Sequence, residues 1–337
     1  MDDRNAQVGW TEAQWNRVRE EILQAWQRVR VAGSFLPIYG PLPSSTQVVP
    51  SEVLKSDGSV DDEATVSLIE IALPVKLSRQ QIWEEDLSSA LLQFRRRATQ
   101  LGQLEDWFIF NGAYPSEDEF APEESGLPHY RPDLAYLNDP DDDSQRARIS
   151  GAPKQIDGLN RDAQLARMRR RNPGSLGLIE GRRVQQAQPA ENRPELNNAG
   201  LMQVVIDAIN SLENNGYVAP YVCVFGRKPF QAAFTPINGS TVLPRDRIEP
   251  LIGRELLHAS GIDIPPQGSD LITEEWQSRG VLLSMADEPI DLALAAEATP
   301  EFRQVDLGGK YVFSVFERFA LRIKDAKAIA PLQFREP

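Results

Sequence analysis

Hydrophobic residues follow two different periods between residues 73 and 112. Leu73, Val75 and Leu77 alternate with other residues, which is the two-residue period of a half-buried strand. Pro74 has no N–H to donate to a neighbouring strand, so this strand is expected at the edge of a sheet. The segment is therefore predicted to begin as an edge strand.

From residue 87 the hydrophobic spacing changes to three and four residues, or multiples of them, which predicts a long helix with one apolar face. That face consists of Leu87, Leu91, Phe94, Ala98, Leu101 and Phe108. We expect Ser88 or Ser89 to cap the start of the helix. Asn111 and Gly112 are expected to end it.

An amphipathic helix is also predicted over residues 10–31. Its apolar face steps by three or four residues along Trp15, Val18, Ile22, Trp26 and Val29. Thr11 and Gln14 have the spacing of a capping box, and Gly33 is expected to end the helix. Two interpretations stay open: the helix packs on its own domain, or it also holds a partner peptide in a groove.

Residues 46–77 are predicted to form a long hairpin around the turn at residues 56–59 and the acidic residues 61–63. An extended, turn-rich link at residues 34–43 precedes the hairpin. A long hairpin without a core of its own is unstable in water, so it is expected to lie on another structure. A neighbouring subunit is one candidate for that structure.

The second half of the chain mixes helices and strands. Helices are expected at residues 200–216, 229–234 and 244–257, and strands at residues 217–225, 280–286, 291–296 and 310–324. Residues 113–173 are rich in proline and charged residues and too polar to bury a core, so we interpret them as a surface insertion. The pattern indicates an α+β fold with an antiparallel sheet.

Composition narrows the class of protein. Hydrophobic residues make up 41% of the 337 residues, which is enough for a core, and no apolar run is long enough to span a membrane. The net charge of −13 argues against nucleic acid as the main partner. A single cysteine, Cys223, and a polar N-terminus without the pattern of a secretory signal favour a cytoplasmic protein.

No constellation typical of a catalytic or metal site emerges from the sequence. The two histidines, His129 and His258, are far apart along the chain. The glycines at 174, 177 and 181 lack the spacing of a dinucleotide loop, and the acidic run at 139–143 lacks the glycine and glutamate of a calcium loop. The basic run at 167–171 suits nucleic acid or an acidic partner, and solvation is its plainer interpretation. By elimination, the sequence points away from an enzyme.

A series of short motifs resembles the encapsulin shell proteins, a family also catalogued as linocin-type bacteriocins. In chain order these motifs are WTEAQW in the first helix, F-x-x-I-x-G-P at residues 35–41, LPVKLSRQQIWEEDL, LEDWFIFNG at the end of the long helix, GLI at residues 177–179, YVCVF, and the closing YVFSVFERFALRIKDAKAIAPLQF. No single motif is highly specific, whereas their order is. The match covers most of the chain except about residues 113–173.

The resemblance implies the tailed-phage major capsid fold. The chain would then divide into an N-terminal helix and arm (1–45), an extension-loop hairpin (46–82), the spine helix of a peripheral domain (83–112), the polar insertion (113–173), a further part of the peripheral domain (174–216), an axial domain (217–290), and strands that return to the peripheral domain and the base of the extension loop (291–337).

The resemblance also implies a function. Encapsulins assemble from copies of themselves into closed icosahedral shells in the cytoplasm, and pores in the shell admit small substrates or ions. They enclose a cargo enzyme that carries a short targeting peptide, often a ferritin-like protein or a dye-decolourising peroxidase. The expected partners are therefore copies of this chain and a cargo protein, with no membrane and no nucleic acid.

Candidate site residues follow from the same resemblance. The pore at the five-fold axis is expected to be lined by Thr235, Pro236, Ile237, Asn238, Gly239, Ser240 and Thr241. The groove for the cargo peptide is expected at Trp15, Ile22, Trp26, Phe35 and Ile38. No catalytic residue and no metal ligand is expected.

A flavin cofactor is a further expectation from the resemblance, although shell formation requires no cofactor. Some encapsulins stack a flavin on a tryptophan, and Trp83 lies near the corresponding place. An ordinary interface aromatic is the plainer interpretation of this residue. The acidic residues that follow it, Glu84, Glu85 and Asp86, match no motif of the family.

Two other functions stay open. A tailed-phage or prophage major capsid protein has the same fold, but a scaffold-like segment would be expected before its first helix, where this sequence has residues 1–9. A secreted bacteriocin or protease is suggested by the older family label. Neither a signal peptide nor a nucleophile–base pair in the sequence supports that function.

Overall fold

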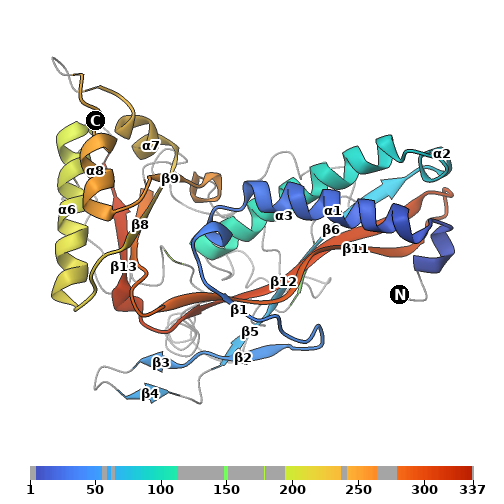
Figure 1. Ribbon diagram of the computed structural model, residues 1–337, viewed down its shortest axis with the longest axis horizontal. Helices are drawn as coiled ribbons and strands as arrows, with labels where there is room; N and C mark the ends of the chain where they lie inside the picture. Colours follow the sequence, from blue (N-terminus) through green and yellow to red (C-terminus); the bar gives the residue numbers. More distant parts are fainter. Residues whose placement is uncertain are drawn as a thin grey trace, which may run out of the picture.

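The computed structural model describes residues 5–54, 59–61, 65–111, 148–150, 178, 194–236, 241–263 and 279–335. Over these residues the chain forms two sheets with helices packed against them, and a hairpin that projects below the larger sheet (Figure 1). Short 3-10 helices are present at η1 (Asn5–Val8), η2 (Ala32–Ser34), η7 (Ser260–Asp263) and η8 (Ala326–Ala328).

The larger sheet has five strands in the order β1-β11-β12-β6-β7. Their bounds are β1 (Ile38–Tyr39), β6 (Ile69–Leu77), β7 (Arg148–Ser150), β11 (Ile290–Val305) and β12 (Tyr311–Ile323). β1 is parallel to β11, whereas the other neighbouring pairs are antiparallel. β12 therefore lies in the middle of the sheet, hydrogen-bonded to β11 on one side and to β6 on the other.

Two helices cover one face of this sheet, α1 (Glu12–Val29) and α3 (Ser88–Asn111) (Figure 1). Side chains alternate along β12, so Phe319, Leu321 and Ile323 point toward the helices and join the main core. The predicted apolar faces of both helices are buried in the same core. The helices approach closely at Gly102, where an added Cβ would lie 2.8 Å from Cγ2 of Val29.

The predicted N-terminal cap is confirmed for α1 and is wrong for α3. The capping box of α1 is confirmed, because the Thr11 and Gln14 side chains each accept a hydrogen bond from the other's backbone N–H. At the start of α3 the acceptors are acidic side chains instead of serines. The Ser89 N–H donates a hydrogen bond of 3.0 Å to Glu84 Oε2, and the Ser88 N–H donates a longer one of 3.3 Å to Asp86 Oδ1. The acidic run after Trp83 therefore satisfies two of the free N–H groups at the start of this helix.

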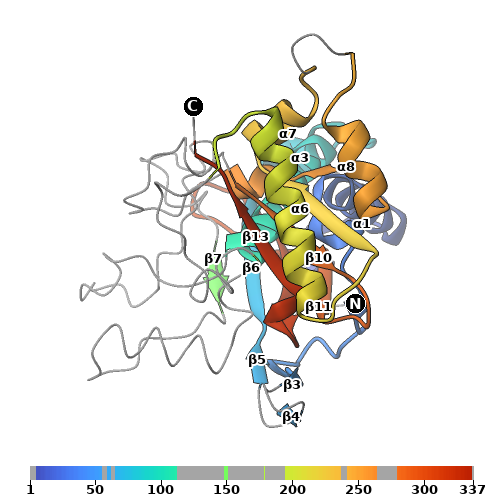
Figure 2. The same ribbon diagram turned by 90° about the vertical axis from the view of Figure 1, so that its left-hand side faces the viewer.

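The smaller sheet has four strands in the order β13-β10-β8-β9, with β8 parallel to β9 and antiparallel pairing elsewhere. Its strands are β8 (Tyr221–Phe225), β9 (Leu257–His258), β10 (Arg279–Ser284) and β13 (Ile329–Gln333), and the helices beside it are α6 (Asn198–Asn214), α7 (Arg227–Ala233) and α8 (Arg245–Ile252). Figure 2 shows α6 running alongside β13 and β10. β13 has no counterpart among the predicted strands.

The two sheets share one core. Along β8, Val222 and Val224 join the main core with α3, whereas Cys223 and Phe225 face α6 in a second cluster. The second cluster also contains Leu201, Val205 and Leu212 of α6, on the face that the sequence predicts. Because alternate residues of β8 belong to different clusters, the smaller sheet is buried on both faces, as its unbroken apolar sequence indicates.

The hairpin consists of two short two-stranded ladders. β2 (Val48–Pro50) pairs with β5 (Thr65–Ser67), and β3 (Val53–Leu54) pairs with β4 (Val60–Asp61) nearer the tip. The predicted hairpin is confirmed in this part. Residues 56–58 of the turn predicted at residues 56–59 lie outside the described part of the chain. The hairpin is shorter than the predicted residues 46–77, because β6 (residues 69–77) is a strand of the larger sheet.

The prediction of an edge strand is confirmed for only part of β6. Pro74 pairs with Ser314 of β12, and over residues 73–77 the described part of the chain provides no second neighbour. Over residues 70–72, however, β6 is covered by β7. β7 comes from the polar insertion, whose other residues lie outside the described part of the chain. Three residues of the insertion thus add a strand at the edge of the sheet, which agrees with a surface segment, and for its other residues the interpretation stays a prediction.

An aromatic cluster fills the core between α1, α3 and the larger sheet. The Phe313 ring stacks on Trp10 with centroids 5.3 Å apart and makes edge contacts of 5.4 Å with both Phe94 and Phe302. Phe313 and Phe94 have no exposed surface. Because Phe313 contacts rings from the N-terminal segment, α3 and β11, it joins all the layers of this domain.

We expect Phe313→Ala to lower the free energy of unfolding by about 3–5 kcal/mol, because the cavity left between the surrounding rings cannot close fully. Urea unfolding of the unassembled subunit measures the change. Phe234→Ala is the matched control, since Phe234 is 38% exposed at the end of α7 and its loss leaves no core cavity. Equal effects of the two substitutions would contradict this account of the core.

Candidate functional site

The arm (residues 34–43) and the hairpin (residues 46–68) form a continuous projection on the side of the larger sheet opposite α1 and α3 (Figure 1). The arm adds the short strand β1 to the edge of the sheet, where Ile38 pairs with Leu292. Large apolar side chains are exposed along the described parts of this projection. They are Ile38 (50%), Tyr39 (39%), Val48 (49%), Leu54 (41%) and Val60 (51%).

A small apolar cluster holds the base of the hairpin against the sheet. Val49 and Val66, which are cross-strand partners in β2 and β5, pack with Leu68 on Ala293 and Ala320. The two alanines lie on the opposite face of the sheet from the main core, because their neighbours Leu292 and Leu321 point toward the helices. Short side chains at these two positions let the hairpin lie close to the sheet.

The tip of the hairpin also contacts its own chain. The Leu54 N–H donates a hydrogen bond of 2.8 Å to the carbonyl oxygen of Lys324, at the end of β12. Between the tip and the smaller sheet lies an open cleft of about 760 Å³. The cleft is lined by Glu52, Leu54, Val60, Asn215, Gly216, Tyr217, Asp287, Pro289, Lys324, Asp325 and Lys327. The hairpin is thus fixed at its base and near its tip, with an open cleft between the tip and the smaller sheet.

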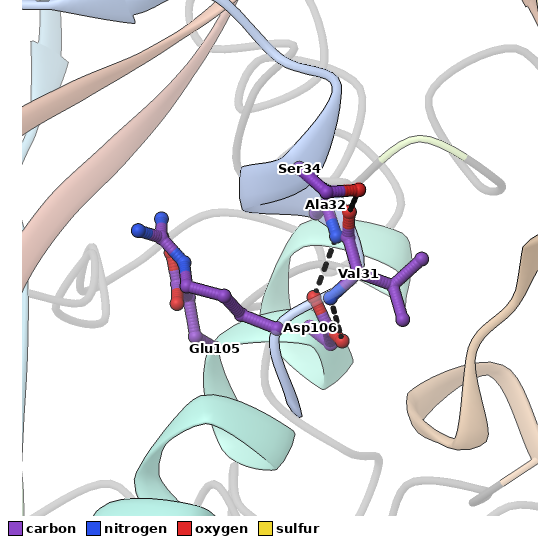
Figure 3. A network of polar contacts seen from close by, with 6 residues as sticks. Val31, Ala32, Ser34, Glu105 and Asp106 are labelled. Atoms are coloured by element: carbon purple, nitrogen blue, oxygen red, sulfur yellow. Dashed lines mark hydrogen bonds and ion pairs between the residues drawn. The ribbon is translucent and has the colours of Figure 1, made fainter. Parts of the chain in front are cut away.

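A buried polar network holds the start of the arm, where the chain leaves α1 (Figure 3). Both oxygens of the Asp106 carboxylate accept backbone hydrogen bonds, from Val31 N–H at 2.8 Å and from Ala32 N–H at 2.9 Å. The neighbouring Glu105 pairs with Arg30 at 2.5 Å. These contacts join α3 to the end of α1, so they fix the direction in which the arm begins.

The same network contains a third carboxyl, Glu317 of β12. Its two oxygens are fully buried and have no hydrogen-bond partner among the residues that the structure describes, whereas Arg30 pairs with Glu105. Burial raises the pKa of Glu317 well above its ordinary value, and the nearby Glu105 raises it further. Burial likewise raises the pKa of Asp106 to about 8 and raises that of Glu105, although Arg30 opposes the shift in both. One arginine therefore faces three buried carboxyls, and protonated carboxyls fit this site better than charged ones.

The residues predicted for a cargo-peptide groove separate into two groups. Trp15, Ile22 and Trp26 have no exposed surface and pack against the chain's own core. Of the two interpretations of the first helix, this burial supports packing on its own domain and leaves these three side chains no surface for a peptide. Phe35 is 9% exposed, and Ile38 is half exposed on the arm. Only Ile38 of the five thus offers a substantial apolar surface.

The predicted pore segment lies between α7 and α8. Thr235, Pro236 and Thr241 are exposed at the ends of this loop, and residues 237–240 lie outside the described part of the chain. From Phe234 to Pro244 the sequence contains no charged residue, whereas Arg245 begins α8 and lies 4.7 Å from the Phe234 ring. The loop is therefore neutral, with basic groups next to it.

The tryptophan predicted to stack on a flavin is strongly exposed. Trp83 follows α2 (Arg79–Ile82), and its side chain is 72% accessible. The Arg79 guanidinium lies 5.8 Å from the ring, so most of the ring surface is free of its own chain. An exposed indole of this kind suits either a stacked planar ligand or a protein neighbour.

Within the described ranges, no group of three or more His, Cys, Asp or Glu side chains is arranged to hold a metal ion. The three carboxyls near Arg30 do not form such a group either. The one cysteine, Cys223, is fully buried in β8. No helix in the described part of the chain is long and apolar enough to cross a membrane.

No family model matches the sequence, and no curated protein matches it. Several solved structures are nevertheless similar to this chain. The virus-like particle from Pyrococcus furiosus is 11% identical over 96% of this chain and 100% of that chain, with a TM-score of 0.51. The holo-SrpI encapsulin complex from Synechococcus elongatus PCC 7942 is 9% identical over 93% of this chain and 88% of that chain, with a TM-score of 0.50.

A phage structure is similar at a lower level. The Microbacterium phage Oxtober96 structure is 10% identical over 92% of this chain and 91% of that chain, with a TM-score of 0.48. The first two likenesses show the fold: the chain has the tailed-phage major capsid fold. The fold implied by the order of the sequence motifs is thereby confirmed.

The buried carboxyls predict how stability depends on pH. In an unfolded chain these groups release their protons near about pH 4, whereas the folded chain holds some of them up to about pH 8. Between these values the folded chain binds more protons, so its free energy of unfolding falls as the pH rises. We expect Glu317→Gln to remove part of this fall and so to raise the free energy of unfolding above that of the natural chain at the upper end of this pH range.

Thermal unfolding of the unassembled subunit between about pH 5 and about pH 8 measures this effect. Glu20→Gln is the matched control, because Glu20 is an exposed carboxylate on α1. The control is expected to follow the natural chain at every pH. A Glu317→Gln subunit that loses stability with rising pH as steeply as the natural chain would contradict the assignment.

Proposed function

We propose that this protein is the subunit of a closed shell, in which copies of the chain assemble through the arm and the hairpin. The observation that carries the proposal is the run of exposed apolar side chains along this projection, from Ile38 to Val60. Exposed apolar groups in a continuous segment are typical of an interaction surface. The capsid fold supports the same conclusion.

The size of the projection also supports assembly. The hairpin has only a small apolar cluster at its base, and its outer ladder pairs two residues with two. Two-stranded ladders of this length are marginal in water, so a partner surface is needed to stabilise the outer part. A copy of the chain supplies such a surface at every position of a shell, because a head-to-tail interface repeats until the structure closes.

The function proposed for the shell is to enclose a cargo enzyme in the cytoplasm, with the shell itself acting as a non-catalytic container. A short apolar peptide of the cargo would bind near the arm, where Ile38 offers a half-exposed side chain. The neutral loop between α7 and α8 would line a pore for small substrates or ions. A ferritin-like protein or a dye-decolourising peroxidase is the class of cargo that the family resemblance suggests.

A bound flavin is a separate part of the proposal. The exposed Trp83 ring supports it, because an indole face that its own chain leaves free can stack on an isoalloxazine ring. We expect purified particles to carry flavin absorbance and Trp83→Ala particles to lose it. Particles of the natural chain without flavin, even after incubation with flavin mononucleotide, would contradict this part and leave the shell proposal unaffected.

Expression of the chain alone tests the central proposal. We expect size-exclusion chromatography and negative-stain microscopy to show uniform closed particles. A stable monomer or small oligomer would contradict self-assembly. Nucleic acid packed inside the particles would favour the alternative of a phage or prophage capsid, and particles without it would favour a container for protein. Release of the chain into the medium would favour the secreted alternative.

Removal of the outer hairpin tests which segment drives assembly. We expect replacement of residues 51–64 by a short Gly-Ser linker to leave the subunit folded, because those of its residues that the structure describes (51–54 and 59–61) contribute no side chain to the main core. Closure into particles is expected to be lost. Circular dichroism checks the fold and microscopy checks the particles. A truncated chain that still closes into shells would show that the hairpin is dispensable.

A further inference from the structure

We propose that Arg318 and Arg322 of β12 set the direction in which the hairpin leaves the sheet, and that this direction determines the size of the closed particle. The inference rests on the proposed shell function. Both arginines lie on the hairpin side of the sheet, because Ala320 between them contacts the hairpin base and side chains alternate along a strand. They therefore face the hairpin from one rigid, central strand.

Arg318 binds the segment just before the hairpin. Its Nη1 donates a hydrogen bond of 2.6 Å to the carbonyl oxygen of Ser44. Its Nη2 pairs with the Glu70 carboxylate at 2.8 Å, across the ladder between β12 and β6. The Glu70 contact holds the guanidinium in place on the sheet, so the Ser44 carbonyl is held at a defined position.

Arg322 binds the hairpin itself. Its Nη1 donates a hydrogen bond of 3.0 Å to the carbonyl oxygen of Pro50, and its guanidinium carbon lies 3.7 Å from the centre of the Tyr39 ring. Two further hydrogen bonds of 2.6 Å join its Nε and Nη2 to the Asp291 carboxylate. This bidentate pair fixes the plane of the guanidinium, and with it the direction of the bond to Pro50.

Two fixed points define a direction. Ser44 precedes β2 and Pro50 ends it, so the two arginines hold the inner strand of the hairpin near both of its ends. The apolar contacts of Val49 and Val66 bring the hairpin onto the sheet, but apolar attraction does not depend on orientation. Hydrogen bonds do depend on it, and those from a charged donor are the stronger kind. The arginines act at the base of the hairpin and the Leu54 N–H bond to Lys324 acts near its tip, and together they supply the angle that the apolar cluster leaves open.

The angle matters because the hairpin is the part that meets neighbouring copies. In a shell built from repeated contacts, a small change in the direction of each contact adds up around the particle and changes where it closes. A hairpin held by two guanidinium groups favours one direction, and hence one particle size. Without them, the same apolar surfaces can join at several angles.

The test uses Arg318→Met and Arg322→Lys. The first substitution removes the bonds to Ser44 and Glu70 from a partly exposed residue. The second keeps a positive charge beside Asp291, which also retains Lys324 at 2.9 Å, but removes the bidentate fork and the donor to Pro50. Arg303→Met is the control, because Arg303 forms an arginine–glutamate pair on β11 that does not involve the hairpin.

We expect the natural chain and Arg303→Met to give one particle size by cryo-electron microscopy, and the two test variants to give mixed sizes or open sheets. A second measurement does not depend on assembly. In dissociated subunits, backbone amides of the hairpin at residues 48, 49 and 65–67 are expected to exchange with solvent about tenfold faster in the test variants than in the control.

The two readouts separate the two proposals. If the natural chain forms no closed particle, the proposed shell function is wrong. Hydrogen exchange still tests whether the two arginines stabilise the position of the hairpin. If both test variants are folded and close into the same single size as the natural chain, the inference about particle size is overturned. Hairpin exchange as slow as in Arg303→Met would overturn the role of the arginines in direction.

Discussion

Alternation of side chains along β12 is the constraint on which the rest of this structure depends. Phe319, Leu321 and Ile323 point to one side and build the core with α1 and α3. Arg318, Ala320 and Arg322 point to the other side and receive the hairpin. A slip of one residue in the pairing of β12 would turn the arginines into the core and the apolar residues toward the hairpin. The register that stabilises the fold thus also places the groups that hold the projection.

Buried charge constrains the same sheet from its other face. Glu317 of β12 shares its surroundings with Glu105, Asp106 and Arg30, and within the described ranges its carboxyl oxygens have no hydrogen-bond partner. Such a group is costly unless it is protonated, so this network does little to stabilise the fold at high pH. Its clearer role is geometric. The Asp106 carboxylate holds the two N–H groups at which the arm begins, which fixes the arm before it reaches the sheet.

Much of the fold could be predicted from hydrophobic period and capping residues. The faces of α1, α3 and α6 and the buried strand β8 are local patterns, and the structure confirms them. β7 and β13 were not predicted, because β7 is a three-residue strand in a polar insertion and β13 contains a proline. The cap of α3 was assigned to serines instead of Glu84 and Asp86, since side-chain acceptors upstream of a helix leave no periodic signal.

The candidate site was less predictable, for a physical reason. A helical stripe such as Trp15, Ile22 and Trp26 indicates burial but does not say whether the cover is the same chain or a partner. The role of Arg318 and Arg322 could not be predicted for a related reason, since each donates to a backbone carbonyl oxygen, which carries no sequence signature. Affinity and direction therefore have different sources in this projection. Exposed apolar side chains can attract a neighbour from any angle, whereas the Arg318 and Arg322 hydrogen bonds limit the angle at which that attraction acts.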